Sequence, residues 1–145
     1  MPVVEETMLI KRRRDEVFAF ATDPANVPLY SSNLVEFEKT SDGPVGKGTT
    51  YRGVAKVAGK SLKWTSEVAE FEPGRRFVNR SIESPMAWEM QVRYEDDAGD
   101  TLIHWRQETD GYSGFFGKLA DPLVTRMYAK DVKSNLEKLK ELLEA

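Results

Sequence analysis

The chain has 145 residues, a net charge of −3 at pH 7 and no cysteine. A domain of this length buries roughly 68–70% of its unfolded surface, so we expect residues 1–145 to form a single domain. The absence of cysteine excludes disulfides, thiolate chemistry and cysteine-based metal sites. The acidic balance of the chain disfavours general nucleic-acid binding, which usually goes with a basic surface.

Two further patterns bear on location and partners. The N-terminal residues contain no long apolar run behind positive charge, so no signal peptide is expected. No stretch approaches the roughly 18 apolar residues that cross a bilayer, and we expect a cytoplasmic protein without a transmembrane segment. The one basic cluster is Lys11-Arg12-Arg13-Arg14. Since no aromatic residues interleave with it to stack on bases, we interpret it as a solvated junction; contact with phosphate or an anionic surface is the alternative.

The N-terminal region is predicted to contain one strand and two short helices. Residues Val3–Ile10 are rich in β-branched and apolar side chains, which favours a strand. Asp15 follows at a position where the positive end of a helix dipole stabilises carboxylates. Asp23 and Pro24 combine an N-cap acceptor with a proline suited to the first helical position. They predict a second short helix that continues through Val27–Tyr30.

The remaining chain is predicted to form an antiparallel meander followed by one long helix. The strands are expected at Leu34–Thr40, Thr49–Val57, Leu62–Phe71, Arg76–Ile82, Met86–Tyr94 and Thr101–Thr109. Their connections are too short for crossover helices, so neighbouring strands pair antiparallel. From about Phe115 to Leu143 the apolar residues recur every three to five positions, which indicates an amphipathic helix. A sheet and a helix that each have one apolar face bury those faces against each other, which predicts an α+β fold.

Alternation within the strands predicts which side chains face the helix. This inward set mixes large aromatic residues with small and polar ones. Its members are Tyr51, Gly53, Ala55, Trp64, Ser66, Val68, Phe77, Asn79, Ser81, Trp88, Met90, Val92, Tyr94, Thr101, Ile103, Trp105, Gln107 and Thr109. Such a mixture packs densely when each small residue faces a large one, or it leaves a concave space with a few polar groups, as ligand sites have. Composition leaves both possibilities open.

Several stretches resemble a known family. They are DEVFAF at 15–20, DPAN at 23–26, GPVGKGT at 43–49, VAEFEPGRRF at 68–77 and NLEKLK at 135–140. Together with the order of the elements, they resemble the helix-grip fold of the START-like (SRPBCC) superfamily, and more specifically its polyketide cyclase/dehydrase and lipid-transport branch. The resemblance covers nearly the whole chain. Its motifs are turns, caps and core positions, which carry no reaction chemistry.

The resemblance implies a cavity between the sheet and the C-terminal helix that binds a small hydrophobic molecule of lipid, polyketide or aromatic type. Its entrance is expected near the short helices and the loop Gly111–Phe116. The family often has tryptophan after the second helix, where this chain has Tyr30. We expect ligand contacts from Tyr30, Tyr51, Gly53, Trp64, Ser66, Asn79, Trp88, Met90, Trp105, Gln107, Phe116, Leu119, Leu123 and Met127. No cofactor or metal is expected.

Groups suited to catalysis are scarce. His104 is the sole histidine, and alternation places it on the outer face, so a histidine dyad is impossible and no His-Glu-x-x-His metal motif exists. The enzymatic alternative is cyclase or dehydratase chemistry, in which a pocket holds reacting atoms in near-attack geometry. Its candidate groups are Tyr51, Asn79, Gln107 and Tyr94, with Asp110 and Glu70 as bases if burial raises the pKa of their carboxyls.

A third hypothesis is a macromolecular interaction factor that uses the basic run at 11–14. Three aromatic residues, Tyr112, Phe115 and Phe116, precede the long helix. They are expected to gate the cavity, to form a homodimer contact or to pack against the end of the sheet.

Overall fold

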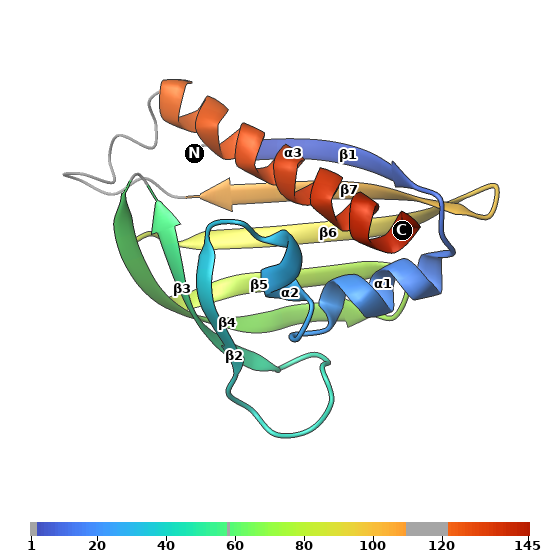
Figure 1. The fold of residues 1–145 in the computed structure, drawn as a ribbon. Helices are drawn as coiled ribbons and strands as arrows, with labels where there is room; N and C mark the ends of the chain where they lie inside the picture. The colour runs from blue at the N-terminus through green and yellow to red at the C-terminus, as the bar shows by residue number, and fades with distance from the viewer. Residues whose placement is uncertain (1–2, 58, 110–121) are drawn as a thin grey trace.

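The structure is a computed structural model that describes residues 3–57, 59–109 and 122–145. The described elements are β1 (Val3–Ile10), α1 (Arg14–Thr22), α2 (Val27–Tyr30), β2 (Leu34–Lys39), β3 (Thr50–Val57), β4 (Lys60–Glu72), β5 (Arg76–Glu83), β6 (Trp88–Asp97), β7 (Asp100–Thr109) and α3 (Pro122–Glu144). The strands form one sheet in the order β1-β7-β6-β5-β4-β3-β2. Figure 1 shows α3 lying across this sheet, with α1 and α2 on the same side.

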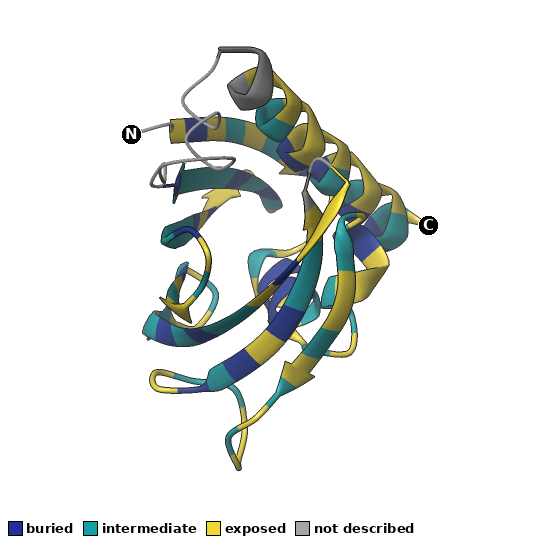
Figure 2. Cartoon of the chain, turned by 90° about the vertical axis from the view of Figure 1, so that its left-hand side faces the viewer, coloured by how far each residue is buried: buried dark blue, intermediate teal, exposed yellow. Residues whose placement is uncertain are grey.

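The sheet confirms the predicted meander from β2 to β7, in which every pair is antiparallel. The first strand, β1, forms the edge of the sheet opposite β2. It pairs antiparallel with β7, from Val3 opposite Glu108 to Ile10 opposite Thr101. The sheet curves strongly, so its inner face partly encloses the space below α3 (Figure 2). A curved sheet and a helix thus surround one interior, which is the predicted α+β architecture.

The hairpin between β6 and β7 fixes which side chains enter that interior. Asp97 pairs with Asp100, and Ala98 and Gly99 between them have φ angles of 52° and 93°. Positive φ at both central residues is the requirement of a two-residue type I′ turn, whose twist matches that of the flanking strands. Because a one-residue slip would turn every side chain to the other face, this turn maintains the inward face of both strands.

The two short helices differ in one respect from the prediction. Asp23 and Pro24 do not start the second helix: a turn occupies residues 24–26, and α2 begins at Val27 with Asn26 as its N-cap. The Asp23 carboxylate instead accepts a hydrogen bond from the backbone N–H of Ala25 at 3.0 Å. The Asp-Pro pair therefore stabilises the turn between the helices rather than a helix start.

The helix α3 buries an apolar stripe made of Val132, Leu136, Leu139 and Leu143. The sequence predicted that Met127 extends this stripe, but its side chain is 55% exposed. Residues four apart share a helix face, so the position that continues the stripe before Val132 is residue 128. Tyr128 is accordingly packed against the core cluster.

The C-terminal end of α3 is joined to the junction between β1 and α1. Glu144 Oε2 accepts hydrogen bonds from the backbone N–H of Lys11 at 2.9 Å and from Lys140 Nζ at 2.5 Å. The Arg12 carbonyl accepts a hydrogen bond from Thr101 Oγ1 at 2.8 Å. In the basic run, Arg13 forms an exposed ion pair with a neighbouring carboxylate. The run therefore lies at a strand–helix junction, where its backbone forms hydrogen bonds with side chains of α3 and β7.

Candidate ligand cavity

A cavity of about 160 Å³ lies between the concave face of the sheet and the three helices. Its lining comes from α1, α2, the segment after α2, strands β2 to β7 and α3. An apolar cavity of about 150 Å³ is known to bind benzene. The space therefore suits a compound of about one aromatic ring.

Aromatic side chains in mutual contact form one wall of the cavity. Phe37 stacks on Tyr51 with ring centroids 4.8 Å apart, and it meets Trp64 at 6.0 Å. Trp64 and Trp88 are perpendicular to each other, with centroids 5.2 Å apart. Trp105 also lines the cavity, so all three tryptophans of the chain contribute to it. Offset and edge-to-face contacts of this kind are favourable beyond the area they bury, so the wall is held in place by its own members.

Gly53 provides the place for the Trp64 ring and does not itself line the cavity. The two residues are paired across β3 and β4. A Cβ atom at Gly53 would lie 2.2 Å from Trp64 Cζ2, a distance that real Cβ contacts do not show. The expectation that Gly53 touches ligand is therefore replaced by a positional role: the missing side chain leaves room for the indole.

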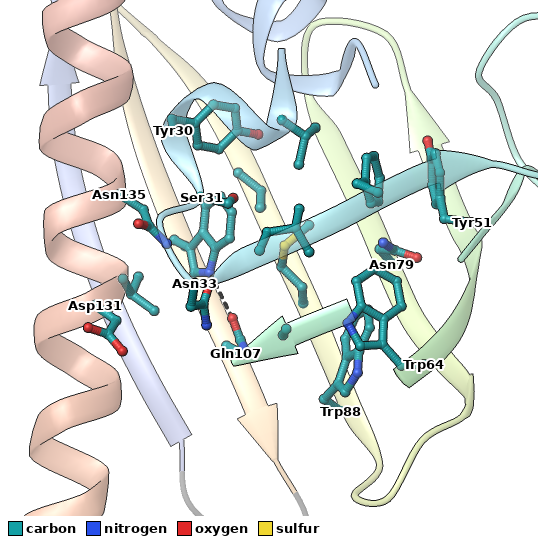
Figure 3. A pocket seen from close by; sticks show the side chains of 18 of the residues that line it. Tyr30, Ser31, Asn33, Tyr51, Trp64, Asn79, Trp88, Gln107, Asp131 and Asn135 are labelled. Carbon is teal, nitrogen blue, oxygen red and sulfur yellow. Dashed lines mark hydrogen bonds between the residues drawn. The ribbon is translucent and has the colours of Figure 1, made fainter. Parts of the chain in front are cut away.

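Polar groups are spaced across the inner face of the sheet. Asn79, Met90 and Gln107 are register partners on β5, β6 and β7, so they form one row across the strands. Trp105 Nε1 donates a hydrogen bond to Gln107 Oε1 at 3.4 Å. Asn79 lines the cavity together with Tyr51 and Trp64 (Figure 3), and its buried Oδ1 has no hydrogen-bond partner. The cavity lining thus includes an amide whose oxygen no protein group satisfies.

A second polar group of residues lies where the chain leaves α2. Ser31 and Asn33 line the cavity beside Asp131 and Asn135 of α3 (Figure 3). Asn135 Oδ1 accepts hydrogen bonds from the backbone N–H and the hydroxyl of Ser32, at 3.1 and 3.2 Å. These bonds connect the segment after α2 to α3 and keep the two sides of the cavity together.

Burial keeps the phenols of the cavity in their neutral form. It raises the pKa of Tyr51 and of Tyr128 to about 12, and it also raises the pKa of Tyr30 and Tyr94. All four hydroxyls are therefore protonated at neutral pH and cannot serve as bases. Partial burial also raises the pKa of Asp131, the one carboxyl among the described lining residues. No lysine, arginine or histidine is found among those lining residues, so the interior is essentially uncharged.

The structure brings most of the predicted contact residues to this cavity. Those that line it are Tyr30, Tyr51, Trp64, Asn79, Trp88, Met90, Trp105 and Gln107. Tyr30 is buried, and its hydroxyl donates a hydrogen bond to the Ala21 carbonyl at 2.5 Å. That these residues contact a ligand stays a prediction.

Other predicted residues lie elsewhere. Ser66 is fully buried and is not in the lining, and the exposed Met127 is also outside it. Phe116 and Leu119 lie outside the described residues, as do the side chain of Leu123 and the predicted entrance loop Gly111–Phe116.

The structure places the predicted catalytic residues outside the cavity lining or leaves them outside the described residues, except for those on the inner face of the sheet. Glu70 is exposed and outside the cavity lining, and its carboxylate pairs with Arg76 Nη2 at 3.2 Å. Asp110 lies outside the described residues. His104 contacts Glu95 Oε2 at 2.8 Å, away from the lining. In the part of the chain that the structure describes, no cluster of three potential metal ligands occurs, and no helix is long and apolar enough to cross a membrane.

The sequence prediction missed Phe37, Leu34, Asp131 and Asn135. A β-bulge between Leu34 and Glu36 breaks the alternation of β2, so Leu34 and Phe37 both reach the cavity although they are three residues apart. Asp131 and Asn135 are spaced four apart beside the buried stripe of α3. That polar i, i+4 pair is the signal that would have indicated them.

Solved structures with the same architecture identify the fold. TTHA0849 from Thermus thermophilus has a TM-score of 0.84 at 23% identity, over 97% of this chain and 95% of that one. The Zhui aromatase/cyclase from Streptomyces sp. R1128 has a TM-score of 0.81 at 18% identity, covering 98% and 93%. A START superfamily protein from Mycobacterium smegmatis has a TM-score of 0.80 at 11% identity, covering 98% and 97%. The fold is therefore the helix-grip fold of START-like proteins.

The family follows from the sequence match. Residues 1–144 match the family described as polyketide cyclase / dehydrase and lipid transport. The chain belongs to this family. No curated protein matches it.

Proposed function

We propose that the protein binds a small, uncharged and largely apolar ring compound in the cavity between the sheet and α3. The observation that carries this proposal is the cavity of about 160 Å³ bordered by three tryptophans. Pockets lined by aromatic residues with a few polar groups are the usual make-up of small-molecule sites. The neutral phenols of Tyr30, Tyr51 and Tyr94 and the family description support an apolar ligand. A cytoplasmic location and a homodimer stay predictions from the sequence.

Filling the cavity is expected to weaken ligand binding without unfolding the protein. Ala55 of β3 lines the cavity, whereas the next residue, Lys56, is exposed. We expect Ala55→Trp to weaken binding of ethylbenzene by at least about tenfold, a loss of 1.4 kcal/mol, because the indole occupies the space that the ligand needs. The affinity is measured by isothermal titration calorimetry.

Lys56→Trp is the matched control, because it adds the same ring one residue away on the outer face. We expect it to bind ethylbenzene as the unaltered protein does. Equal affinities of the Ala55→Trp and Lys56→Trp proteins would show that ethylbenzene binds elsewhere.

A second candidate function is proton transfer of the cyclase or dehydratase type, which Asp131 favours. It contributes a carboxyl to the cavity lining, and partial desolvation raises the pKa of this carboxyl. A raised pKa brings a carboxylic acid closer to the pH at which it exchanges protons efficiently. One of the similar solved structures is an aromatase/cyclase, which supports the same class of reaction.

Asp131→Asn tests this candidate. If Asp131 transfers a proton, the variant loses turnover of a linear polyketone by about 10²–10⁴-fold, while affinity for that compound is retained. The rate of the unaltered enzyme would rise with pH as the carboxyl ionises, if it acts as a base. Turnover that is equal in the two proteins, or that is undetectable in both, argues for binding alone.

A further inference from the structure

Asn79 occupies a position that is costly for an amide. It lies on β5, the fourth strand in the order of the seven-stranded sheet, and therefore at its centre. Its side chain lines the cavity, the residue is only 6% exposed, and its Oδ1 has no hydrogen-bond partner. No hydrogen bond found among the described residues involves this side chain. A buried polar group without a partner destabilises the fold, so the amide needs another reason to be there.

Ser66 shows that position, not burial alone, distinguishes Asn79. The Ser66 hydroxyl is also buried and unpartnered, on the adjacent strand β4. Ser66 is 0% exposed and does not line the cavity. Of these two residues with unsatisfied groups, Asn79 alone lines the cavity.

The surroundings of Asn79 define the chemistry it can recognise. Its amide offers an acceptor oxygen and an NH₂ group with two donor hydrogens, and a hydroxyl can pair with either group. Tyr51 and Trp64, which also line the cavity (Figure 3), provide aromatic surface for a ring. The described lining has no cation to balance an anionic substituent, and its one carboxyl, on Asp131, is on α3 rather than on the sheet.

We infer that Asn79 is the residue that selects the polar substituent of the ligand, so that an uncharged ring compound binds with a hydroxyl group against the Asn79 amide and its ring against the aromatic wall. This inference rests on the proposed function. It adds the orientation of the ligand, with the polar group at the centre of the sheet, and the residue that discriminates a phenol from the parent hydrocarbon.

The test compares 4-ethylphenol with ethylbenzene, two compounds that differ by one hydroxyl. Dissociation constants of both are measured for the unaltered protein, for Asn79→Leu and for Ser66→Ala. The preference is the ratio of the two constants, so differences in the hydration of the free compounds cancel between proteins. We expect Asn79→Leu to reduce the preference for 4-ethylphenol by at least about tenfold, because the leucine cannot pair with the hydroxyl. Ser66→Ala leaves the preference unchanged.

Thermal unfolding provides an independent readout. Asn79→Leu replaces an unpartnered amide with an apolar group of similar size, so its thermal midpoint is expected to rise while the preference falls. If the leucine variant does not fold, Asn79→Ala replaces it in the binding test.

The outcomes separate the inference from the proposed function. If both compounds bind and the preference is the same with and without Asn79, water alone satisfies the amide and the inference is wrong, while the cavity remains a binding site. If neither compound binds the unaltered protein, the proposed function fails and the inference with it. A preference that falls equally in Ser66→Ala and Asn79→Leu also contradicts the role of Asn79.

Discussion

Replacing Leu139 with alanine is expected to lower the free energy of unfolding by about 2–5 kcal/mol. The Leu139 side chain is 0% exposed and belongs to the cluster that joins α3 to the sheet and α1. Truncation removes buried methyl groups and leaves a cavity that the neighbouring strands cannot close. Urea unfolding should show a lower midpoint with an unchanged slope, because the surface exposed on unfolding is nearly the same.

Met127→Ala is the control on the same helix. Its side chain is 55% exposed, so the expected change is within about 0.5 kcal/mol. A similar loss in the Met127 and Leu139 variants would mean that α3 is packed with a different face toward the sheet. The cavity, which α3 helps to close through Tyr128, would then have a different lining.

Replacing Gly53 with alanine should destabilise the protein, although glycine to alanine usually stabilises a strand. The ordinary effect of this change is a gain of roughly 0.5–1 kcal/mol. Here the added methyl group would lie 2.2 Å from the Trp64 ring, which is itself in contact with Phe37 and Trp88. Overpacking of this kind costs about 1–3 kcal/mol. We expect a net loss of stability and weaker binding of ethylbenzene, because the displaced indole changes the cavity wall.

Gly46→Ala separates the clash from the general effect of removing a glycine. A Cβ atom at Gly46 meets nothing within 4 Å, and its φ is not in the positive range. Its expected stability is unchanged or higher by about 0.4–1 kcal/mol. An increase in stability for Gly53→Ala as well would show that Trp64 does not rest on this glycine.

The fold was predictable because the residue pattern within each strand and turn indicates which residues of neighbouring strands pair. Alternation in β6 and β7 placed Trp88, Met90, Trp105 and Gln107 on one face, and the structure brings all four to the cavity. The Ala98-Gly99 turn preserves that register. Residue patterns of period two are reliable wherever the pairing is regular.

The cavity was less predictable where its geometry depends on contacts between distant segments. The bulge in β2 directs both Leu34 and Phe37 inward, and no alternating pattern can show that. Gly53 was assigned to the ligand because it alternates correctly, yet its role is to accommodate a ring from the neighbouring strand. The predicted apolar stripe of α3 differs by one position from the observed stripe at its N-terminal end. Met127 and Tyr128 are both compatible with the apolar spacing, and only packing decides between them.

The most direct test of ligand binding in the cavity uses the indole N–H groups of Trp64, Trp88 and Trp105, which are the three tryptophans of the chain and all line the cavity. Their signals in a ¹H–¹⁵N correlation spectrum are followed while ethylbenzene is added. If the cavity is the ligand site, all three signals shift together and stop shifting at a single equivalent of bound compound. Unchanged indole signals at a saturating concentration would contradict a ligand site between the sheet and α3.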